Sequence, residues 1–87
     1  MSYTIKFTKQ ASIDAEYLRK SHLADKTKKI IEIIREDPFS NPPPFEKLIG
    51  DLHGMYSRRL NIQHRLVYSV DKNNKIIKII RMWKHYE

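Results

Sequence analysis

The segment from residue 37 to residue 54 limits the fold of this chain more than any other feature of its sequence, because it holds all four prolines and both glycines. Proline fixes φ and lacks the backbone N–H, so this segment cannot continue a helix or a strand for long. We therefore expect a long loop that divides the chain into two parts. Loops of this length are uncommon in small domains and are usually functional or disordered. We expect this one to pack against the protein, since it carries apolar side chains at Phe39, Phe45, Leu48, Ile49 and Leu52.

Before the loop, the spacing of apolar residues predicts one short strand and two helices. Residues 3–7 alternate apolar and polar side chains, as a half-buried strand does. Residues 12–21 fit a helix with Ser12 as its N-cap and with Asp14 and Glu16 in its first turn. The second helix is clearer, because it has one apolar face made of Leu23, Thr27, Ile30, Ile31 and Ile34. Pro38 ends it. The two helices are expected to form an antiparallel hairpin.

After the loop, the pattern predicts a meander of three antiparallel strands at residues 55–60, 64–70 and 75–83. The last strand is apolar on both faces, so we expect it inside the sheet and covered. The order of strand, two helices and three strands indicates an α+β fold, with the helical pair on one face of a small antiparallel sheet. Eighty-seven residues suit one compact domain, so we expect residues 1–87 to form a single domain.

The residue types that are missing exclude several kinds of site. The chain has no cysteine, which excludes disulfides, thiolate zinc sites and a cysteine nucleophile. His22, His53 and His64 have no partner at metal-ligand spacing, so we expect no metal. No apolar run is long enough for a signal peptide or a membrane span, and a cytoplasmic protein without a membrane partner is expected.

The net charge of +7 is the first indication of function. Residues 1–44 hold eight basic and six acidic side chains, whereas residues 45–87 hold nine basic and four acidic ones. The second half is therefore expected to face a polyanion, with nucleic acid favoured over an acidic protein. The alternative is that the charge serves only solubility.

Arginines on the predicted strands are the candidate binding groups. Alternation places Arg58 on one face with Tyr56 and Leu60, and places Arg59 on the other; on the next strand, Arg65 opposes the apolar face. A guanidinium is a planar fork that fits phosphate oxygens, so a basic strand face suits a phosphate backbone. The alternative is a solvated basic face without catalysis.

Two further side chains are candidates for acid-base chemistry. Glu46 lies in an apolar-flanked run in the basic half of the chain, and a carboxylate among arginines stays ionised and can act as a base. The alternative for Glu46 is a surface residue paired with Lys47. His85, beside Tyr86, could act as an acid at neutral pH, or it could simply be an exposed residue near the end of the chain.

Several short motifs follow one another in a fixed order. They are Glu46-Lys47-Leu48, then Leu52 and Gly54, then Tyr56-Ser57-Arg58-Arg59-Leu60, then His64-Arg65-Leu66-Val67-Tyr68, and finally His85-Tyr86. Together they resemble the signature of the YoeB/Txe toxins, a branch of the RelE superfamily that forms the toxin half of type II toxin-antitoxin pairs. The resemblance covers nearly the whole chain.

The resemblance implies a microbial-RNase-like (RelE-like) fold and a metal-independent endoribonuclease with no cofactor, which cleaves messenger RNA in the ribosomal A site by transesterification. It implies that Glu46 takes the proton of the ribose 2′-hydroxyl, that Arg65 and Arg59 stabilise the transition state, and that His85 protonates the leaving 5′-oxygen. Tyr86 would orient His85 or hold a phosphate. The residues assigned to binding RNA or the ribosome are Lys47, Arg58 and Lys84.

The resemblance also implies partners, namely the 70S ribosome with its message and a cognate acidic antitoxin similar to YefM or Axe, whose partly disordered segment would cover the basic cleft. The oligomeric state stays open, with a homodimer among the alternatives.

One departure from the family pattern supports a different function. Ile49 stands where the family has a lysine, although Lys47 could compensate from another direction. The alternative to an enzyme is therefore a RelE-fold module that binds RNA or protein, or regulates, without cleaving. A DNA-binding domain is a weaker alternative, since no recognition helix is apparent.

Overall fold

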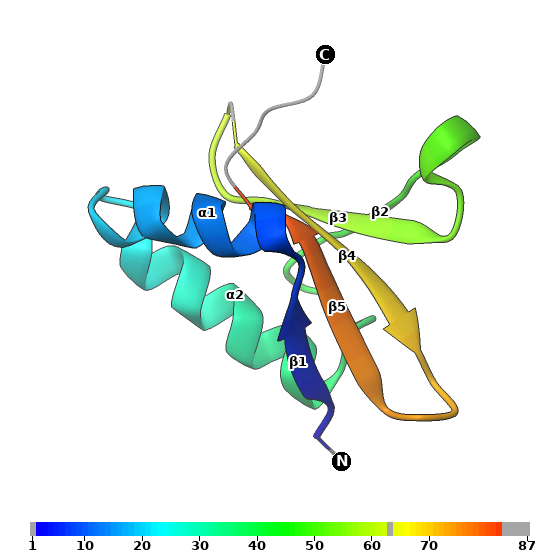
Figure 1. Ribbon diagram of the computed structural model, residues 1–87. Coiled ribbons are helices and arrows are strands. Elements are labelled where there is room, and N and C mark those ends of the chain that lie inside the picture. The colour runs from blue at the N-terminus through cyan, green and yellow to red at the C-terminus, as the bar shows by residue number, and fades with distance from the viewer. Residues whose placement is uncertain (1, 63, 83–87) are drawn as a thin grey trace.

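The computed structural model describes residues 2–62 and 64–82, which form two helices and a five-stranded sheet (Figure 1). The elements in chain order are β1 (Thr4–Phe7), α1 (Lys9–Arg19), α2 (Ala24–Glu36), β2 (Glu46–Lys47), a 3-10 turn (Gly50–Leu52), β3 (Met55–Arg59), β4 (Arg65–Asp71) and β5 (Ile76–Arg81). The predicted α+β class is confirmed, and the predicted strand, two helices and three strands occur in that order with ends shifted by one to three residues. β2 and the 3-10 turn lie in the segment that was expected to be a loop, and they were not predicted.

The sheet has the strand order β1-β5-β4-β3-β2. β2, β3, β4 and β5 pair in antiparallel fashion, whereas β1 pairs with β5 in parallel, from Thr4 opposite Ile76 to Phe7 opposite Ile79. The two helices connect β1 to the rest of the chain and lie together on one side of the sheet (Figure 1). β5 is therefore an interior strand, as its two apolar faces predicted.

The start of α1 differs from the sequence expectation. The N-cap is Thr8, whose hydroxyl accepts a hydrogen bond from the N–H of Ala11 at 3.0 Å, and the expected cap at Ser12 is wrong. Asp14 consequently lies in the middle of the helix rather than in its first turn, and it is buried. Its carboxylate accepts hydrogen bonds from the Gln10 amide at 2.9 Å and from the N–H of Met82 at 3.1 Å, so it ties α1 to the end of β5.

The core lies between the helices and the sheet. α1 and α2 contribute Ala11, Leu18, Ile30 and Ile34, with Leu23 between them, and the sheet contributes Leu60, Leu66, Tyr68, Ile77, Ile79 and Met82. Burial of each large apolar side chain contributes about 1.5–3 kcal/mol, so this layer stabilises the packing of the helices on the sheet. Thr27 on the apolar face of α2 is also buried and donates its hydroxyl to the carbonyl of Leu23.

The proline-rich segment packs against the sheet through Pro38, which is buried, and through its two phenylalanines. The rings of Phe39, Phe45 and Tyr56 lie 5.1–6.0 Å apart, which confirms that its aromatic residues pack down. Ile49, in contrast, is 84% exposed, so the expectation that it packs was wrong. Within the described residues, no helix has the length and apolarity that crossing a membrane requires.

Candidate functional site

Glu46 and Arg65 come together on the face of the sheet that points away from the helices. β2 places Glu46 opposite Ser57 of β3, and β4 places Arg65 opposite Arg59 of the same strand. Ser57 and Arg59 are two residues apart, so their side chains and those of their partners share one face. Across this face, Nη1 of Arg65 lies 3.4 Å from Oε1 of Glu46. The carboxylate therefore pairs with an arginine of the sheet, and not with Lys47.

Arg59 adds a second guanidinium beside this pair. It is exposed and lies directly opposite Arg65 in the β3–β4 register, where like charges on neighbouring strands destabilise the sheet. Two arginines paired across β3 and β4 with one carboxylate nearby leave a net positive charge in this part of the sheet, which favours an anion here. Arg59 also lines a groove of about 580 Å³ between α2 and the proline segment, with Lys26, Lys29, Ile30, Ile33 and Pro42–Pro44.

Lys47 does not join this face. It follows Glu46 directly in β2 and pairs with Tyr56, so its side chain leaves the strand on the opposite side. Lys47 is exposed at the edge of the sheet. It therefore cannot supply, next to Glu46, the positive charge that is missing at Ile49.

Arg58 is buried, which corrects the expectation that it binds RNA directly. The residue is 1% exposed and lies on the helix-facing side of β3. Its Nε donates to the hydroxyl of Tyr68 at 3.2 Å, Nη1 to the carbonyl of Pro43 at 2.5 Å, and Nη2 to the carbonyl of Pro38 at 3.1 Å. Its Cζ lies 5.1 Å from the centre of the Phe45 ring, a cation-π contact. Arg58 thus contacts the proline segment instead of the solvent.

Tyr68 shares the proline carbonyl with Arg58. Its hydroxyl donates to the carbonyl of Pro38 at 2.7 Å. Burial raises the pKa of Tyr68, and the hydrogen bond from Arg58 acts in the opposite direction. The phenol therefore stays protonated at neutral pH and remains a donor. Tyr68 lies on the apolar face of β4 with Leu66, a position that its alternation in the sequence predicts.

Lys84, His85 and Tyr86 lie outside the described residues, and their roles stay predictions. No group of three or more acidic or histidine side chains that could hold a metal occurs in residues 2–62 and 64–82.

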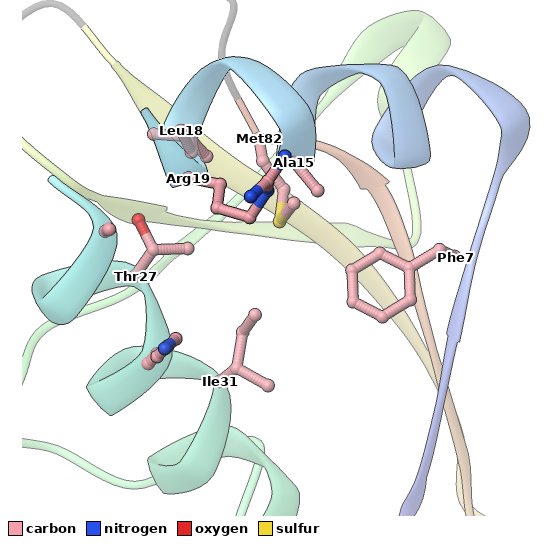
Figure 2. Close-up of a pocket in the computed structure, with 9 residues that line it drawn as sticks. Phe7, Ala15, Leu18, Arg19, Thr27, Ile31 and Met82 are labelled. Atoms are coloured by element: carbon pink, nitrogen blue, oxygen red, sulfur yellow. The ribbon is translucent and has the colours of Figure 1, made fainter. Parts of the chain in front are cut away.

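A second cavity lies on the helix side of the sheet, away from Glu46. Figure 2 shows Phe7 of β1, Ala15 and Leu18 of α1, and Thr27 and Ile31 of α2 around this space of about 260 Å³. Its described lining is mainly apolar, with Arg19 and Lys28 as the charged groups, and includes no carboxylate or imidazole. These side chains offer no base, so the Glu46 face is the better candidate for chemistry.

The arrangement on the Glu46 face suits a reaction at a phosphate. A carboxylate can accept a proton from a hydroxyl, and the Arg65 guanidinium 3.4 Å away can stabilise the negative charge that develops on phosphate oxygens. Both kinds of group are solvent-accessible here, because the side chains of Glu46 and Arg65 are 61% and 24% exposed.

Comparison with protein families gives one match that spans almost the whole chain. Residues 7–86 match the model of the YoeB-like toxin of bacterial type II toxin-antitoxin systems. The chain is 38% identical over 58 residues to Toxin YoeB of Synechocystis, an alignment that covers 67% of this chain and 65% of that protein.

Solved structures agree with this match. The YoeB/ParE toxin from Agrobacterium tumefaciens superimposes with a TM-score of 0.87 at 27% identity, covering 95% of this chain and 99% of that one. The toxin in a YoeB-YefM complex from Staphylococcus aureus gives a TM-score of 0.80 at 36% identity, covering 99% and 100%. The structure of a YoeB dimer from the same organism gives 0.83 at 34% identity, again covering 99% and 100%.

Proposed function

The chain belongs to the family of YoeB-like toxins of bacterial type II toxin-antitoxin systems, and from this premise we propose that it is an endoribonuclease that cleaves messenger RNA in the ribosomal A site. Toxins of this family are generally endoribonucleases. The contact between Glu46 and Arg65, with Arg59 opposite Arg65, is the observation on which the proposal depends. Cleavage of a message on the ribosome would stop translation in the cytoplasm.

The proposed reaction is a transesterification. Glu46 takes the proton of the ribose 2′-hydroxyl, and the 2′-oxygen attacks the adjacent phosphorus. The bond from phosphorus to the 5′-oxygen breaks, and His85 protonates that oxygen. Arg65 and Arg59 stabilise the charge on the phosphate oxygens, and Tyr86 orients His85 or holds a phosphate. The products are an upstream fragment with a 2′,3′-cyclic phosphate and a downstream fragment with a 5′-hydroxyl.

The Glu46–Arg65 contact supports this division of roles in one specific way. The guanidinium of Arg65 lies 3.4 Å from the carboxylate of Glu46 in the resting protein, so it is already close to the phosphate that the base must approach. When RNA binds, the same guanidinium can turn to the phosphate oxygens, because both side chains are partly exposed.

Two partners belong to the proposal. We expect an antitoxin whose acidic segment covers the face with Arg59 and Arg65, since the S. aureus relative was solved with YefM. We also expect the ribosome to bind basic side chains outside the reacting groups, with Lys47 and Lys84 as candidates. A homodimer is a further expectation, since the same relative was solved as a dimer.

The chemistry of the cut ends tests the proposal. A message bound to the ribosome would be cut by the protein, and the 3′ end of the upstream fragment would be analysed by mass spectrometry. A 2′,3′-cyclic phosphate is expected, and 2′-deoxyribose on the 5′ side of the scissile bond is expected to abolish cutting there. An upstream 3′-hydroxyl, or undiminished cutting of the deoxy substrate, would mean that water is the nucleophile and that Glu46 has another role.

A module that binds without cleaving is the second candidate, because Ile49 is 84% exposed where the family has a lysine. The same assay separates the two functions. A folded protein that binds programmed ribosomes tightly and leaves the message intact would support the binding module.

A further inference from the structure

We infer that Arg58 is a positioning residue for the reaction, because it fixes the proline segment and thereby sets where Glu46 lies relative to Arg65. The inference rests on the proposed function of Glu46. It assigns Arg58 to the opposite side of β3 from the reacting groups, where it touches neither RNA nor ribosome.

The bonds of Arg58 connect β3 to the beginning and to the middle of the proline segment. Two of its nitrogens donate to carbonyls, one at Pro38 and one at Pro43, and its Nε donates to Tyr68 of β4. Tyr68 in turn donates to the carbonyl of Pro38. A single guanidinium therefore joins the beginning of the segment, its middle and two neighbouring strands.

The proline segment needs a side-chain donor of this kind. Pro42, Pro43 and Pro44 have no backbone N–H, so this stretch cannot donate to a strand ladder as an ordinary edge strand does. It can only accept. The fork of Arg58 supplies N–H groups to two of its carbonyls, and a lysine, with a single ammonium, would not span both with the same geometry.

The surroundings of Arg58 also indicate that its position is fixed. Within the described part of the chain, no carboxylate lies within ion-pair distance of it, so the buried charge is compensated by carbonyl and phenol oxygens and by the Phe45 ring. A buried charge is costly unless such partners are in place. Moving the segment would remove them, so the segment and the guanidinium stabilise each other's positions.

Glu46 comes directly after the residues that Arg58 contacts, and we call these contacts of Arg58 with Pro38, Pro43 and Phe45 the clamp. Phe45, the residue before Glu46, packs its ring against the Arg58 guanidinium. Pro43, whose carbonyl accepts from Arg58, lies three residues before Glu46. β2 has only two residues and pairs with β3 through Glu46 opposite Ser57 and Lys47 opposite Tyr56. So short an edge strand makes few ladder bonds of its own. The bond from the N–H of Leu48 to the carbonyl of Met55, at 2.9 Å, holds its far end, and the contacts of the preceding residues hold the end at Glu46.

The test compares Arg58→Lys and Tyr68→Phe with the wild-type protein and with Arg35→Lys as a matched control. Arg35 is a partly exposed residue in the last turn of α2 that pairs with Glu32. Single-turnover cleavage would be measured over a range of programmed-ribosome concentrations. Arg58→Lys is expected to lower the rate at saturation about ten-fold to a hundred-fold, because small misplacements of a reacting group cost this much. The half-saturating concentration is expected to stay within about two-fold of wild type, since Arg58 is buried.

Tyr68→Phe tests the same clamp without removing a charge. It removes one bond to Arg58 and one to Pro38 and is expected to lower the saturated rate in the same direction, by a smaller factor. Hydrogen exchange provides a readout that does not depend on activity. The amides of residues 45–48 are expected to exchange several-fold faster in Arg58→Lys than in wild type, and at the wild-type rate in Arg35→Lys.

Several results would overturn the inference. In the first, folded Arg58→Lys has the wild-type saturated rate, and its residues 45–48 exchange at the wild-type rate. In the second, Arg58→Lys loses only binding affinity and its salt dependence, which would indicate a direct RNA contact. If wild type itself does not cleave, the proposed function fails, and the exchange experiment still decides whether Arg58 holds the segment.

Discussion

Glu46→Gln should separate catalysis from stability, because Glu46 is the proposed base and its exposed ion pair contributes little to the free energy of unfolding. The substitution keeps the size of the side chain and removes its charge. The lost ion pair has a distance of 3.4 Å, and the Glu46 side chain is 61% exposed. Pairs of this kind contribute about 0.2–1 kcal/mol in water. For a domain of this size, that corresponds to a melting temperature lower by at most about 8 °C. The cleavage rate, in contrast, should fall by about 10² to 10⁴, the usual contribution of a general base.

A second ion pair in the same protein provides the matched control. Glu32 and Arg35 of α2 also lie 3.4 Å apart, and the Glu32 side chain is 63% exposed. Glu32→Gln should therefore change the melting temperature about as much as Glu46→Gln while leaving cleavage at the wild-type rate. Thermal melts and single-turnover cleavage on programmed ribosomes would be measured for both variants. A folded Glu46→Gln protein that cleaves within about three-fold of wild type would remove Glu46 from the mechanism.

Three further predictions concern neighbouring groups. Arg65→Ala should cause a severe loss of the saturated cleavage rate and Arg65→Lys only a partial one, because an ammonium cannot reproduce the planar fork; equal rates for the two variants would argue against a bidentate role. Antitoxin association should slow as salt rises and should protect Arg59 and Arg65 from arginine-selective modification, whereas a partner that leaves both reactive would contradict occlusion of this face. Burial raises the pKa of Tyr68, so its contribution to the free energy of unfolding is complete below about pH 10 and is lost as the pH rises through the raised value. The difference in stability between wild type and Tyr68→Phe should therefore shrink in alkaline melts, and a constant difference would refute this reasoning.

Much of the fold could be predicted because periodicity reports burial directly. The apolar spacing of α2 identified its buried residues, and the two apolar faces of β5 identified an interior strand. The parallel pairing of β1 with β5 could not be read in this way. Which strand lies beside β1 depends on how the helical hairpin crosses the sheet, and alternation within a strand carries no information about its neighbour.

The start of α1 was misplaced for a local reason. Thr8 and Ser12 are both good N-caps, and the choice between them depends on tertiary contacts. Thr8 donates its hydroxyl to the carbonyl of Ile80 in addition to capping the helix. That second bond, to a residue far away in the sequence, favours the earlier start and places Asp14 in the interior.

The site was only partly predictable. The carboxylate and the arginines on the exposed face were identified from residue type and alternation, and the structure brings Glu46 and Arg65 together. The role of Arg58 was misjudged, because its charge was given more weight than its position. Alternation had already placed it on the same face as Tyr56 and Leu60, which is the face that the core covers. An arginine on an apolar face beside a donor-poor proline segment is the signal that could have identified the clamp.

The adjacent arginines of β3 show how one strand can both hold the proline segment and present a charge on the exposed face of the sheet. Consecutive residues of a strand point to opposite faces, so Arg58 reaches the proline segment inside the protein while Arg59 reaches the exposed face. A slip of one residue in the β3–β4 pairing would exchange the two faces, burying Arg59 and exposing Arg58. The three bonds of Arg58 disfavour such a slip, because exposing Arg58 would break its bonds to Tyr68, Pro43 and Pro38. The same contacts that hold Glu46 in place thus also keep Arg59 and Arg65 on the face where a phosphate can bind.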